Sequence, residues 1–580
     1  MVGPGAVVTP ETFKDAPWEE VRPYYRELAE RPLDLANAEA WLADWSAFEE
    51  ALGEAATKAE FACSQDTADA GAEAAQRRFT EEIEPLADEQ RVGLQKRLVA
   101  LGYTRADLEV VLQQFRCDID LFREANIPLE TELSSLATEW NKLSGGLTVR
   151  WQGEELTPDA LLPFLLENDR SVREQAFRLR AQAHLEKRGE AAAIFDRMHV
   201  LRTEVARNAG FANYRDYAHK AMGRFDYTPD DCLHFHEAVE EVAKPAAARI
   251  LERRARKMGL ERLRPWDLAV DAEGRERLRP FADVAMLREH AGAVLGQVDP
   301  AFSARYEAME EAGTLDLENR KDKAPGGYCA PLAWSRVPVI FMNAVGVDED
   351  VRTLLHESGH AMHDFEAFKQ PLVFLRETGS EIAEVASMSM ELLADPYLDL
   401  AKGGYYNAAD AARSKATMLE EIILFLPHCA AVDAWQQWAY TAPEGASQEA
   451  REAKWLELRG RFEPGVIDWG GLDQERIARW YQQPHFFTDP FYYIEYGIAQ
   501  MGALQVWRNS LQDKEAAVRA YRSALALGSS ASLPKLYAAA GAKMVFDAAG
   551  MQELVGLVEA ELQALDLGLQ TPEDPGVGLA

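Results

Sequence analysis

Apolar residues recur with a helical spacing over most of the chain. Residues 18–96 are rich in Ala, Glu, Leu and Arg, and few Gly or Pro residues interrupt them. Residues 160–256 have a similar composition, and the same pattern returns from Asp410 onward. Because these residue types favour helix and their apolar members recur at helical spacing, the pattern predicts a mainly α-helical protein.

The pattern changes between residues 315 and 345. The segment LENRKDKAPGGYCA carries turn residues, and residues 337–341 after it are mostly β-branched or aromatic. Such residues favour a strand. Pro338 has no N–H to donate within a sheet, so we expect an edge strand rather than a central one. The segment predicts a small β-sheet in an otherwise helical protein.

Three helices are expected around the residues that could carry chemistry. Asp348 or Asp350 can start the first, which we place over residues 348–365. The second, an acidic helix, is expected over residues 380–394. The third is expected over residues 490–508 and begins among tyrosines.

Length and charge narrow the class of protein. A chain of 580 residues, of which 47% are apolar and 27% charged, has the composition of a large globular protein with several lobes. Its 62 Lys and Arg stand against 96 Asp and Glu, a net charge of −34. Such a surface repels the phosphates of nucleic acids and anionic lipids, so neither partner is expected. It could favour cationic substrates, although solubility alone accounts for it.

Cysteine usage and apolar runs indicate the compartment. The five cysteines are widely spaced, odd in number and form no CxxC pair, which argues against a disulfide framework and a thiolate zinc knot. The first twenty residues lack a basic start followed by an apolar core, and no apolar run approaches the length of a membrane span. We therefore expect a cytoplasmic protein.

Residues 356–360, with the sequence HESGH, form an HExxH motif. On a helix, His356 and His360 lie one turn apart on one face and can bind one zinc ion, while Glu357 can act as general base toward water. The composition of the chain gives only about 0.03 such matches by chance. The alternative is a pair of surface histidines, but the apolar pair before the motif and the small residues inside it indicate a packed interior.

A hydrolytic zinc site needs a third protein ligand and one open position. The acidic helix offers Glu381, Glu384 and Glu391. Glu384 and Glu391 share a face, and Glu391 could orient a ligating imidazole instead of binding the ion. Glu381 could equally be a solvated or salt-bridging side chain, and periodicity alone does not choose among the three.

Two other groups of residues have both a functional and a structural interpretation. His363 follows His356 by seven residues and is expected to contribute to the substrate pocket or to support a ligand. His234 and His236 splay apart on a helix and are expected to be structural. Tyr493 and Tyr496 share a helix face, so two phenol donors point together, although the aromatic residues around them could equally form a core stripe.

These motifs together resemble the thimet oligopeptidase / oligoendopeptidase F family of zinc peptidases, in its bacterial oligoendopeptidase branch. The likeness rests on TLLHESGHAMH, on SEIAEVASMSMELL, on GGYCAPLAWSRVPVIFMNAVG upstream and on PHFFTDPFYYIEYGIAQMGALQVW downstream. It covers roughly residues 200–510. The resemblance implies that Glu384 is the third zinc ligand. It also implies that Tyr496, with Tyr493 and with His485 on a mobile loop, stabilises the oxyanion.

The resemblance also implies the architecture. We expect an elongated two-lobed fold around a deep central channel, with a small sheet near the active site. Residues 1–200 would form part of one lobe and residues 201–580 the catalytic region. The strand would bind an extended peptide by strand addition. The expected substrate-binding residues are Gly326, Gly327, Tyr328, Val339, Asn343 and His363.

The function expected from the sequence is zinc-dependent cleavage of short, unstructured peptides within the chain. A dipeptidyl carboxypeptidase-like exopeptidase is the alternative, because only a group that binds the substrate's terminal carboxylate separates the two. A catalytically silent peptide-binding protein is a third reading, against which the intact motif argues. One Zn²⁺ ion is expected, although a site of two histidines and a glutamate also accepts other divalent ions. We expect a monomer or a small homo-oligomer.

Overall fold

The computed structural model describes residues 8–570, so the first residues of the segment searched for a secretory signal lie outside it. The described chain is mostly helical and contains two small sheets, which confirms the predicted fold class. It divides into two compact units. Unit 1 contains residues 8–122, 279–411 and 499–544, and unit 2 contains residues 123–278, 412–498 and 545–570. The division expected at residue 200 falls inside the helix Arg188–Asn208 of unit 2.

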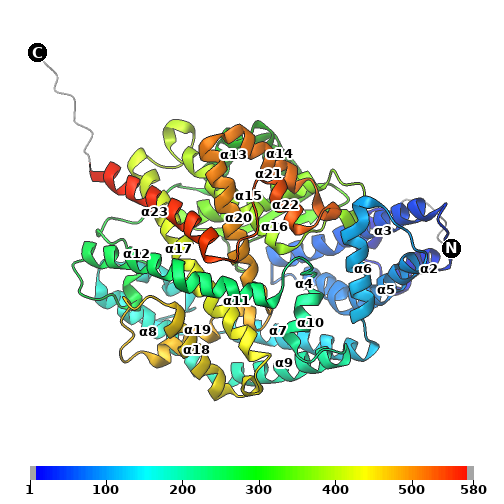
Figure 1. Ribbon diagram of the computed structural model, residues 1–580, viewed down its shortest axis with the longest axis horizontal. Helices are drawn as coiled ribbons and strands as arrows, with labels where there is room; N and C mark the ends of the chain where they lie inside the picture. Colours follow the sequence, from blue (N-terminus) through cyan, green and yellow to red (C-terminus); the bar gives the residue numbers. More distant parts are fainter. Residues whose placement is uncertain (1–7, 571–580) are drawn as a thin grey trace, which may run out of the picture. The chain divides into compact units, whose positions relative to one another are not determined.

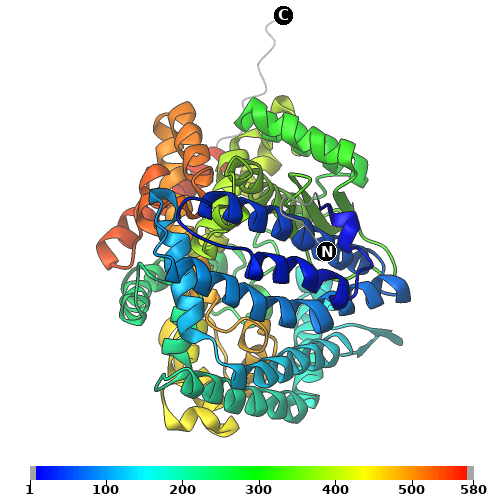
Figure 2. The ribbon, with the colours of Figure 1, turned by 90° about the vertical axis from the view of Figure 1, so that its right-hand side faces the viewer.

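The N-terminal helices of unit 1 pack side by side, in blue, in Figures 1 and 2. Their core is aromatic: Trp41, Trp45 and Phe48 of one helix meet Phe13 and Tyr25 of two others. Phe374, which precedes the acidic helix predicted over residues 380–394, packs against Trp45. The helices are α1 (Pro10–Phe13), α2 (Trp18–Glu30), α3 (Ala38–Gln65), α4 (Ala70–Arg77), α5 (Glu84–Ala100) and α6 (Glu109–Leu121).

The rest of unit 1 combines a three-stranded sheet with further helices. The strands are β3 (Leu315–Glu318), β4 (Tyr328–Leu332) and β5 (Val337–Ala344), in the order β3-β5-β4. β5 pairs in parallel with β3 and antiparallel with β4. The helices are α13 (Val284–Val298), α14 (Pro300–Ala312), α15 (Asp348–Ala367), α16 (Ser380–Ala394), α21 (Lys514–Leu525) and α22 (Leu533–Ala539).

The prediction that residues 337–341 form an edge strand is wrong, because β5 is the central strand of its sheet. The missing N–H of Pro338 is tolerated there for two reasons. Pro338 lies opposite Pro331 of β4, and the pairing with β3 begins only at Ile340. β4 is therefore an outer strand of the sheet, and the small sheet itself is present as predicted.

Unit 2 is built from helices and one two-stranded hairpin, β1 (Val149–Trp151) and β2 (Glu154–Leu156). α8 packs against α19, and α19 against α18 (Figure 1). The helices are α7 (Ile127–Gly145), α8 (Arg170–Glu186), α9 (Arg188–Asn208), α10 (Tyr214–Ala221), α11 (Pro229–Ala238), α12 (Lys244–Lys257), α18 (Gln448–Phe462), α19 (Asp473–Tyr481) and α23 (Ala548–Gln570). α17 (Ala408–Ala439) begins in unit 1 and continues into unit 2, and α20 (Tyr493–Gln512) begins in unit 2 and continues into unit 1.

No helix within residues 8–570 has the combination of length and apolarity that a membrane crossing requires.

Candidate active site

The helix that carries the HExxH motif is anchored at its first turn. Asp350 accepts hydrogen bonds from the backbone N–H groups of Val345, Gly346 and Val347, at 2.7–2.9 Å. The acidic residues of this first turn also suit the positive end of the helix dipole. α15 therefore begins at Asp348, one of the two starts that the sequence allows.

α15 and α16 pack unusually closely at Gly359. A Cβ atom added there would lie 2.5 Å from Cα of Ser387 and 2.7 Å from the carbonyl oxygen of Ala386. Backbone atoms cannot move aside cheaply, so only glycine allows this approach. The close packing brings His356 and His360 of one helix beside Glu384 of the other.

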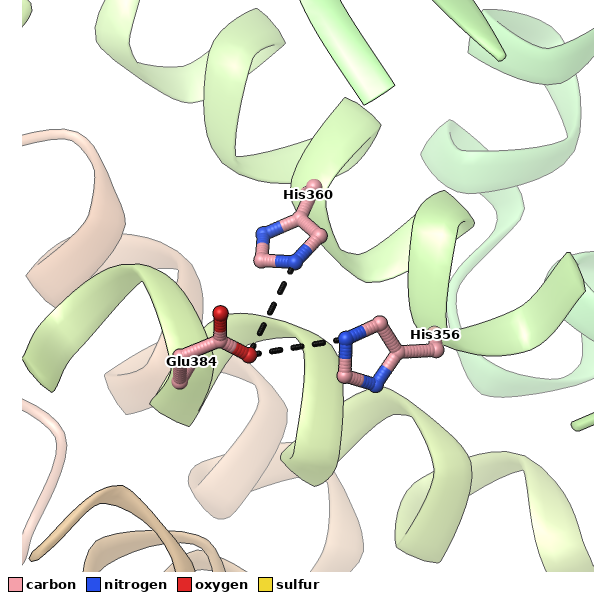
Figure 3. Close-up of side chains that lie close together, drawn as sticks. All are labelled: His356, His360 and Glu384. Carbon is pink, nitrogen blue, oxygen red and sulfur yellow. Dashed lines mark ion pairs between the residues drawn. The ribbon is translucent and has the colours of Figure 1, made fainter. Parts of the chain in front are cut away.

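The three expected ligands converge in unit 1 (Figure 3). Oε2 of Glu384 lies 3.5 Å from Nε2 of His356 and 3.8 Å from Nε2 of His360. Ligand atoms about 3.4 Å apart surround a tetrahedral zinc ion with bonds of about 2.0–2.1 Å. The three side chains thus fit a metal ion of this size. Among the described residues, this is the one cluster of His, Cys, Asp or Glu able to hold a metal, and it excludes Glu381 and His363.

Two further side chains fix the orientation of these ligands. Nδ1 of His356 lies 2.8 Å from Oε1 of Glu391, so the imidazole donates to that carboxylate and turns Nε2 toward Glu384. Oγ of Ser387 donates to Oε2 of Glu384 at 3.1 Å. Supporting contacts of this kind orient metal ligands and raise their basicity. The role considered for Glu391 from its helical spacing agrees with this contact.

The two histidines have opposite protonation preferences in the metal-free chain. Burial lowers the pKa of His356, but hydrogen bonds to Glu384 and Glu391 outweigh burial and raise it well above its usual value. Burial lowers the pKa of His360 to about 4, despite the nearby Glu384. Only deprotonated nitrogens bind a metal, so His360 is ready for an ion and His356 must first release its proton.

Glu357 is buried beside this cluster. Burial, together with the charges of Glu384 and Glu391, raises its pKa to about 7 in the metal-free chain, although protonated His356 opposes the shift. A carboxylate whose pKa lies near neutrality can accept a proton and then return it. Glu357 therefore has the environment that a general base requires.

His363 lies on the same helix but outside the ligand cluster. It is buried, and burial lowers its pKa to about 4.

The structure also brings together two residues that the sequence did not single out, Cys329 and Asp364. Sγ of Cys329, on β4, lies 3.8 Å from Oδ2 of Asp364, and burial raises the pKa of Asp364 to about 7. No sequence signal pairs these two residues, because the contact joins a strand to a helix.

The residues expected to bind substrate, apart from His363, lie in the three-stranded sheet and in the turn before β4. Val339 is 1% exposed, so a substrate cannot reach it. Nδ2 of Asn343 donates to the carbonyl oxygens of Ala324 and Gly326, at 2.8 and 3.0 Å, and thereby holds the turn before β4. Gly326 has a φ of +92° in that turn, a conformation that favours glycine.

The next two residues continue this surface into β4. A Cβ atom on Gly327 would lie 3.3 Å from the carbonyl oxygen of Phe341, so the turn passes close to β5. The ring of Tyr328 stacks on Phe341 with centroids 5.1 Å apart. β5 is paired with β4 from Val337 to Phe341 and with β3 from Ile340 onward, so it offers no free edge where the two pairings overlap, whereas β4 is an outer strand of the sheet.

The tyrosine helix begins in unit 2. The rings of Tyr493 and Tyr496 lie 5.6 Å apart, and the ring of His485 lies 4.9 and 6.0 Å from them. All three residues are half-buried, whereas Ile494 and Glu495 between the tyrosines are buried. The phenols therefore share one face and are not a fully buried core stripe.

The histidine pair of α11 is divided between the interior and the surface. His236 is buried and its Nε2 lies 2.8 Å from Oδ2 of Asp433, whereas His234 is exposed. The two side chains point to different environments and do not form a joint site.

A helical protein with two histidines and a glutamate in ligand geometry, beside a buried glutamate, has the features of a metallopeptidase. The chain belongs to peptidase family M3: the model of that family matches residues 164–556, and the model of its N-terminal domain matches residues 9–115. It is accordingly a metallopeptidase enzyme.

Solved structures share this fold over nearly the whole chain. PZ peptidase A with an inhibitor is 25% identical, with a TM-score of 0.87 over 96% of this chain and 99% of that one. A protein provisionally named oligoendopeptidase F is 26% identical, with a TM-score of 0.88 and the same coverage. Another, from Bacillus anthracis strain Ames, is 24% identical with a TM-score of 0.83, covers 97% of this chain and 99% of its own, and shows the fold alone. No curated protein matches the sequence.

Proposed function

We propose that this metallopeptidase is a zinc-dependent endopeptidase that hydrolyses short, unstructured peptides. The observation that supports this most is the convergence of His356, His360 and Glu384, with Glu357 buried beside them. When bound, a zinc ion would polarise the scissile carbonyl and lower the pKa of a coordinated water toward about 7.

The side chains of this site then have distinct roles. Glu357 accepts the proton of the attacking water and passes it to the nitrogen of the leaving amine as the peptide bond breaks. Glu391 keeps the His356 imidazole in the tautomer that exposes Nε2. His363, buried on the same helix, is proposed to contribute to substrate binding and not to hold the ion.

Tyr496 is proposed to donate a hydrogen bond to the oxyanion of the tetrahedral intermediate, with Tyr493 and His485 assisting. The support comes from the sequence resemblance and from the half-buried phenol face in unit 2. Burial raises the pKa of Tyr493 well above its usual value, which keeps that phenol protonated and able to donate.

We propose that an extended substrate pairs with the outer edge of β4, between Tyr328 and Leu332. Main-chain hydrogen bonds at a strand edge bind peptides without demanding particular side chains. Gly326 and Gly327 shape the turn that leads into this edge, and Asn343 holds that turn in place. Val339 no longer belongs among the contact residues, because it is buried.

The cellular setting is part of the proposal. No disulfide joins the five cysteines, all of which lie among the described residues, and this suits a reducing cytoplasm. The partners are short peptides, and we expect a monomer or small homo-oligomer.

Product mapping by mass spectrometry tests this function on a peptide that is capped at both ends. Internal cleavage by the zinc-loaded protein supports the endopeptidase. Cleavage of only the version with a free C-terminus, two residues from its end, favours the dipeptidyl carboxypeptidase reading. Stoichiometric binding without turnover of either version would contradict both.

A further inference from the structure

A fully buried ion pair holds the first turn of the tyrosine helix in unit 2. Nη2 and Nε of Arg224 donate to Oε1 of Glu495 at 2.7 and 3.1 Å. The two side chains are 0% and 3% exposed. Glu495 lies between Tyr493 and Tyr496 in the sequence but faces the interior. Because a helix is rigid, fixing Glu495 also fixes the direction of the two phenols.

Arg224 also holds the residue at which the chain turns into this helix. Its Nη2 donates to the carbonyl oxygen of Phe491 at 2.6 Å. The N–H of Phe491 donates to Oε1 of Gln436 at 2.7 Å. Phe491 has a φ of +71°, which is unfavourable for a bulky residue and persists only where its surroundings enforce it. Buried side chains therefore hold both polar backbone groups of a strained residue.

The third contact of Arg224 restricts the guanidinium itself. Its Nη1 lies 3.1 Å from Nε2 of His219. Burial and the nearby Arg224 lower the pKa of His219 to about 3, so the imidazole is neutral and Nε2 can accept this bond. A lysine has one ammonium group and cannot make these planar, divergent contacts together.

A second buried arginine holds the preceding loop in the same way. Nη1 of Arg202 donates to the carbonyl oxygen of Phe486 at 2.9 Å, and Nη2 donates to that of Phe487. Phe486 directly follows His485. The segment that carries His485, Tyr493 and Tyr496 is thus tied to the interior of unit 2 by two arginines, while its polar rings stay on the half-buried side.

From these contacts we propose that Arg224 is a positioning residue for catalysis, which acts through Glu495 and Phe491 on the orientation of Tyr496 and Tyr493. This inference rests on the proposed function, because it assumes that these phenols take part in the reaction. A substitution far from the chemistry that displaces a catalytic group by about 1 Å can lower the rate by about a hundredfold.

The test is a double-mutant cycle of Arg224→Lys and Tyr496→Phe, with kcat and KM measured for an internally quenched peptide. Arg224→Lys is expected to lower kcat by about tenfold with little change in KM. In the Tyr496→Phe background the same substitution should lower kcat by less than about twofold, because only the assisting phenol of Tyr493 is then left for Arg224 to position.

Arg173→Lys is the matched control. Arg173 is likewise a buried arginine of unit 2, paired with buried Asp267 and donating to backbone carbonyls, but none of its contacts involves the tyrosine segment. It should lower thermal stability and leave kcat of the folded protein unchanged. Hydrogen exchange gives a readout independent of activity: Arg224→Lys should speed exchange of the amides of residues 491–498, and Arg173→Lys should not.

Independent, multiplicative effects of Arg224→Lys and Tyr496→Phe would overturn the proposal, as would an unchanged kcat in Arg224→Lys. If Arg224→Lys does not fold, Glu495→Gln replaces it in the same cycle. This variant keeps an acceptor for Arg224 but removes the charge that strengthens the contact, so the same pattern of effects on kcat is expected. The activity of the wild type on the same internally quenched peptide tests the proposed function separately. An inactive wild type would overturn both, whereas an active wild type with multiplicative effects would overturn only the positioning role.

Discussion

Nδ1 of His356 lies 2.8 Å from Oε1 of Glu391, two turns along α16 from the proposed ligand Glu384. In the proposed site, one helix would thus supply both a ligand for the ion and the acceptor that orients another ligand. The close approach of α15 and α16 at Gly359 brings His356 and His360 of one helix within 2.8–3.8 Å of Glu384 and Glu391 of the other.

Glu391→Gln should weaken metal binding by about 10- to 100-fold, because the imidazole loses a charged acceptor. The measurement is a zinc competition titration with a chromophoric chelator. Glu381→Gln is the control, since Glu381 lies on the same helix, is buried, and is outside the ligand cluster. Equal weakening by the two substitutions would contradict the role of Glu391.

Gly359→Ala should lower the free energy of unfolding by about 1–3 kcal/mol and weaken metal binding, because the added methyl group forces the two helices apart. Denaturant unfolding and the same zinc titration measure both effects. Gly53→Ala is the matched substitution in α3, where a Cβ atom would meet nothing within 4 Å. It should be neutral or stabilising, since alanine favours helix more than glycine does. Metal binding unaffected by Gly359→Ala would show that the helix spacing does not set the site.

Asp364 and Asp316 should respond to pH in opposite directions. Burial raises the pKa of Asp364 to about 7, above the value of 3.8 expected for an unfolded chain, although the bond from Cys329 opposes the shift. An acid with a raised folded pKa costs stability as pH rises through that window. The free energy of unfolding of Asp364→Asn, relative to the wild type, should therefore increase from pH 5 to pH 8 in the metal-free protein.

Asp316 is the control for this pH dependence. Burial raises its pKa, but hydrogen bonds from Arg320 and Lys323 outweigh burial and lower the pKa to about 2. Its stabilising effect is fully present above about pH 4 and is lost as pH falls toward 2. Asp316→Asn should thus be destabilising by the same amount at pH 5 and pH 8. A flat profile for Asp364→Asn would contradict the buried, protonated state of Asp364.

Tyr496→Phe should lower kcat by about a hundredfold and leave KM and zinc content nearly unchanged, because a phenol that stabilises the oxyanion acts in the transition state. Tyr492→Phe is the control: its ring lies 5.1 Å from that of Tyr496, and no catalytic role is assigned to it. If the two substitutions have the same effect on kcat, Tyr496 is not the oxyanion donor.

Local patterns predicted the elements better than their connections. The HExxH helix and the acidic helix could be predicted from helical periodicity. In the HExxH helix, the two histidines lie one turn apart, so the sequence alone places them on one face. The choice of Glu384 over Glu381 needed the resemblance, since periodicity places several carboxylates on one helix. The contact between Glu391 and His356 depends on how closely two helices approach, and only Gly359 hinted at that.

Contacts between residues far apart in the chain could not be predicted from the sequence. Pro338 is a sound signal for a missing donor, but its effect depends on where the neighbouring strands begin and end, and β3 begins after it. The pair Arg224 and Glu495 is separated by 271 positions, and no local pattern joins them. The two units likewise combine distant segments, which a linear division of the chain cannot anticipate.

The central claim is that Glu357 is the general base of a zinc endopeptidase. The most direct test compares zinc-loaded wild type with Glu357→Gln on a short internally quenched peptide capped at both ends, with metal content measured in both proteins. Wild type should cleave within the peptide, and the variant should keep its zinc and lose nearly all activity. Full activity in the zinc-loaded variant, or no cleavage by zinc-loaded wild type, would contradict the account.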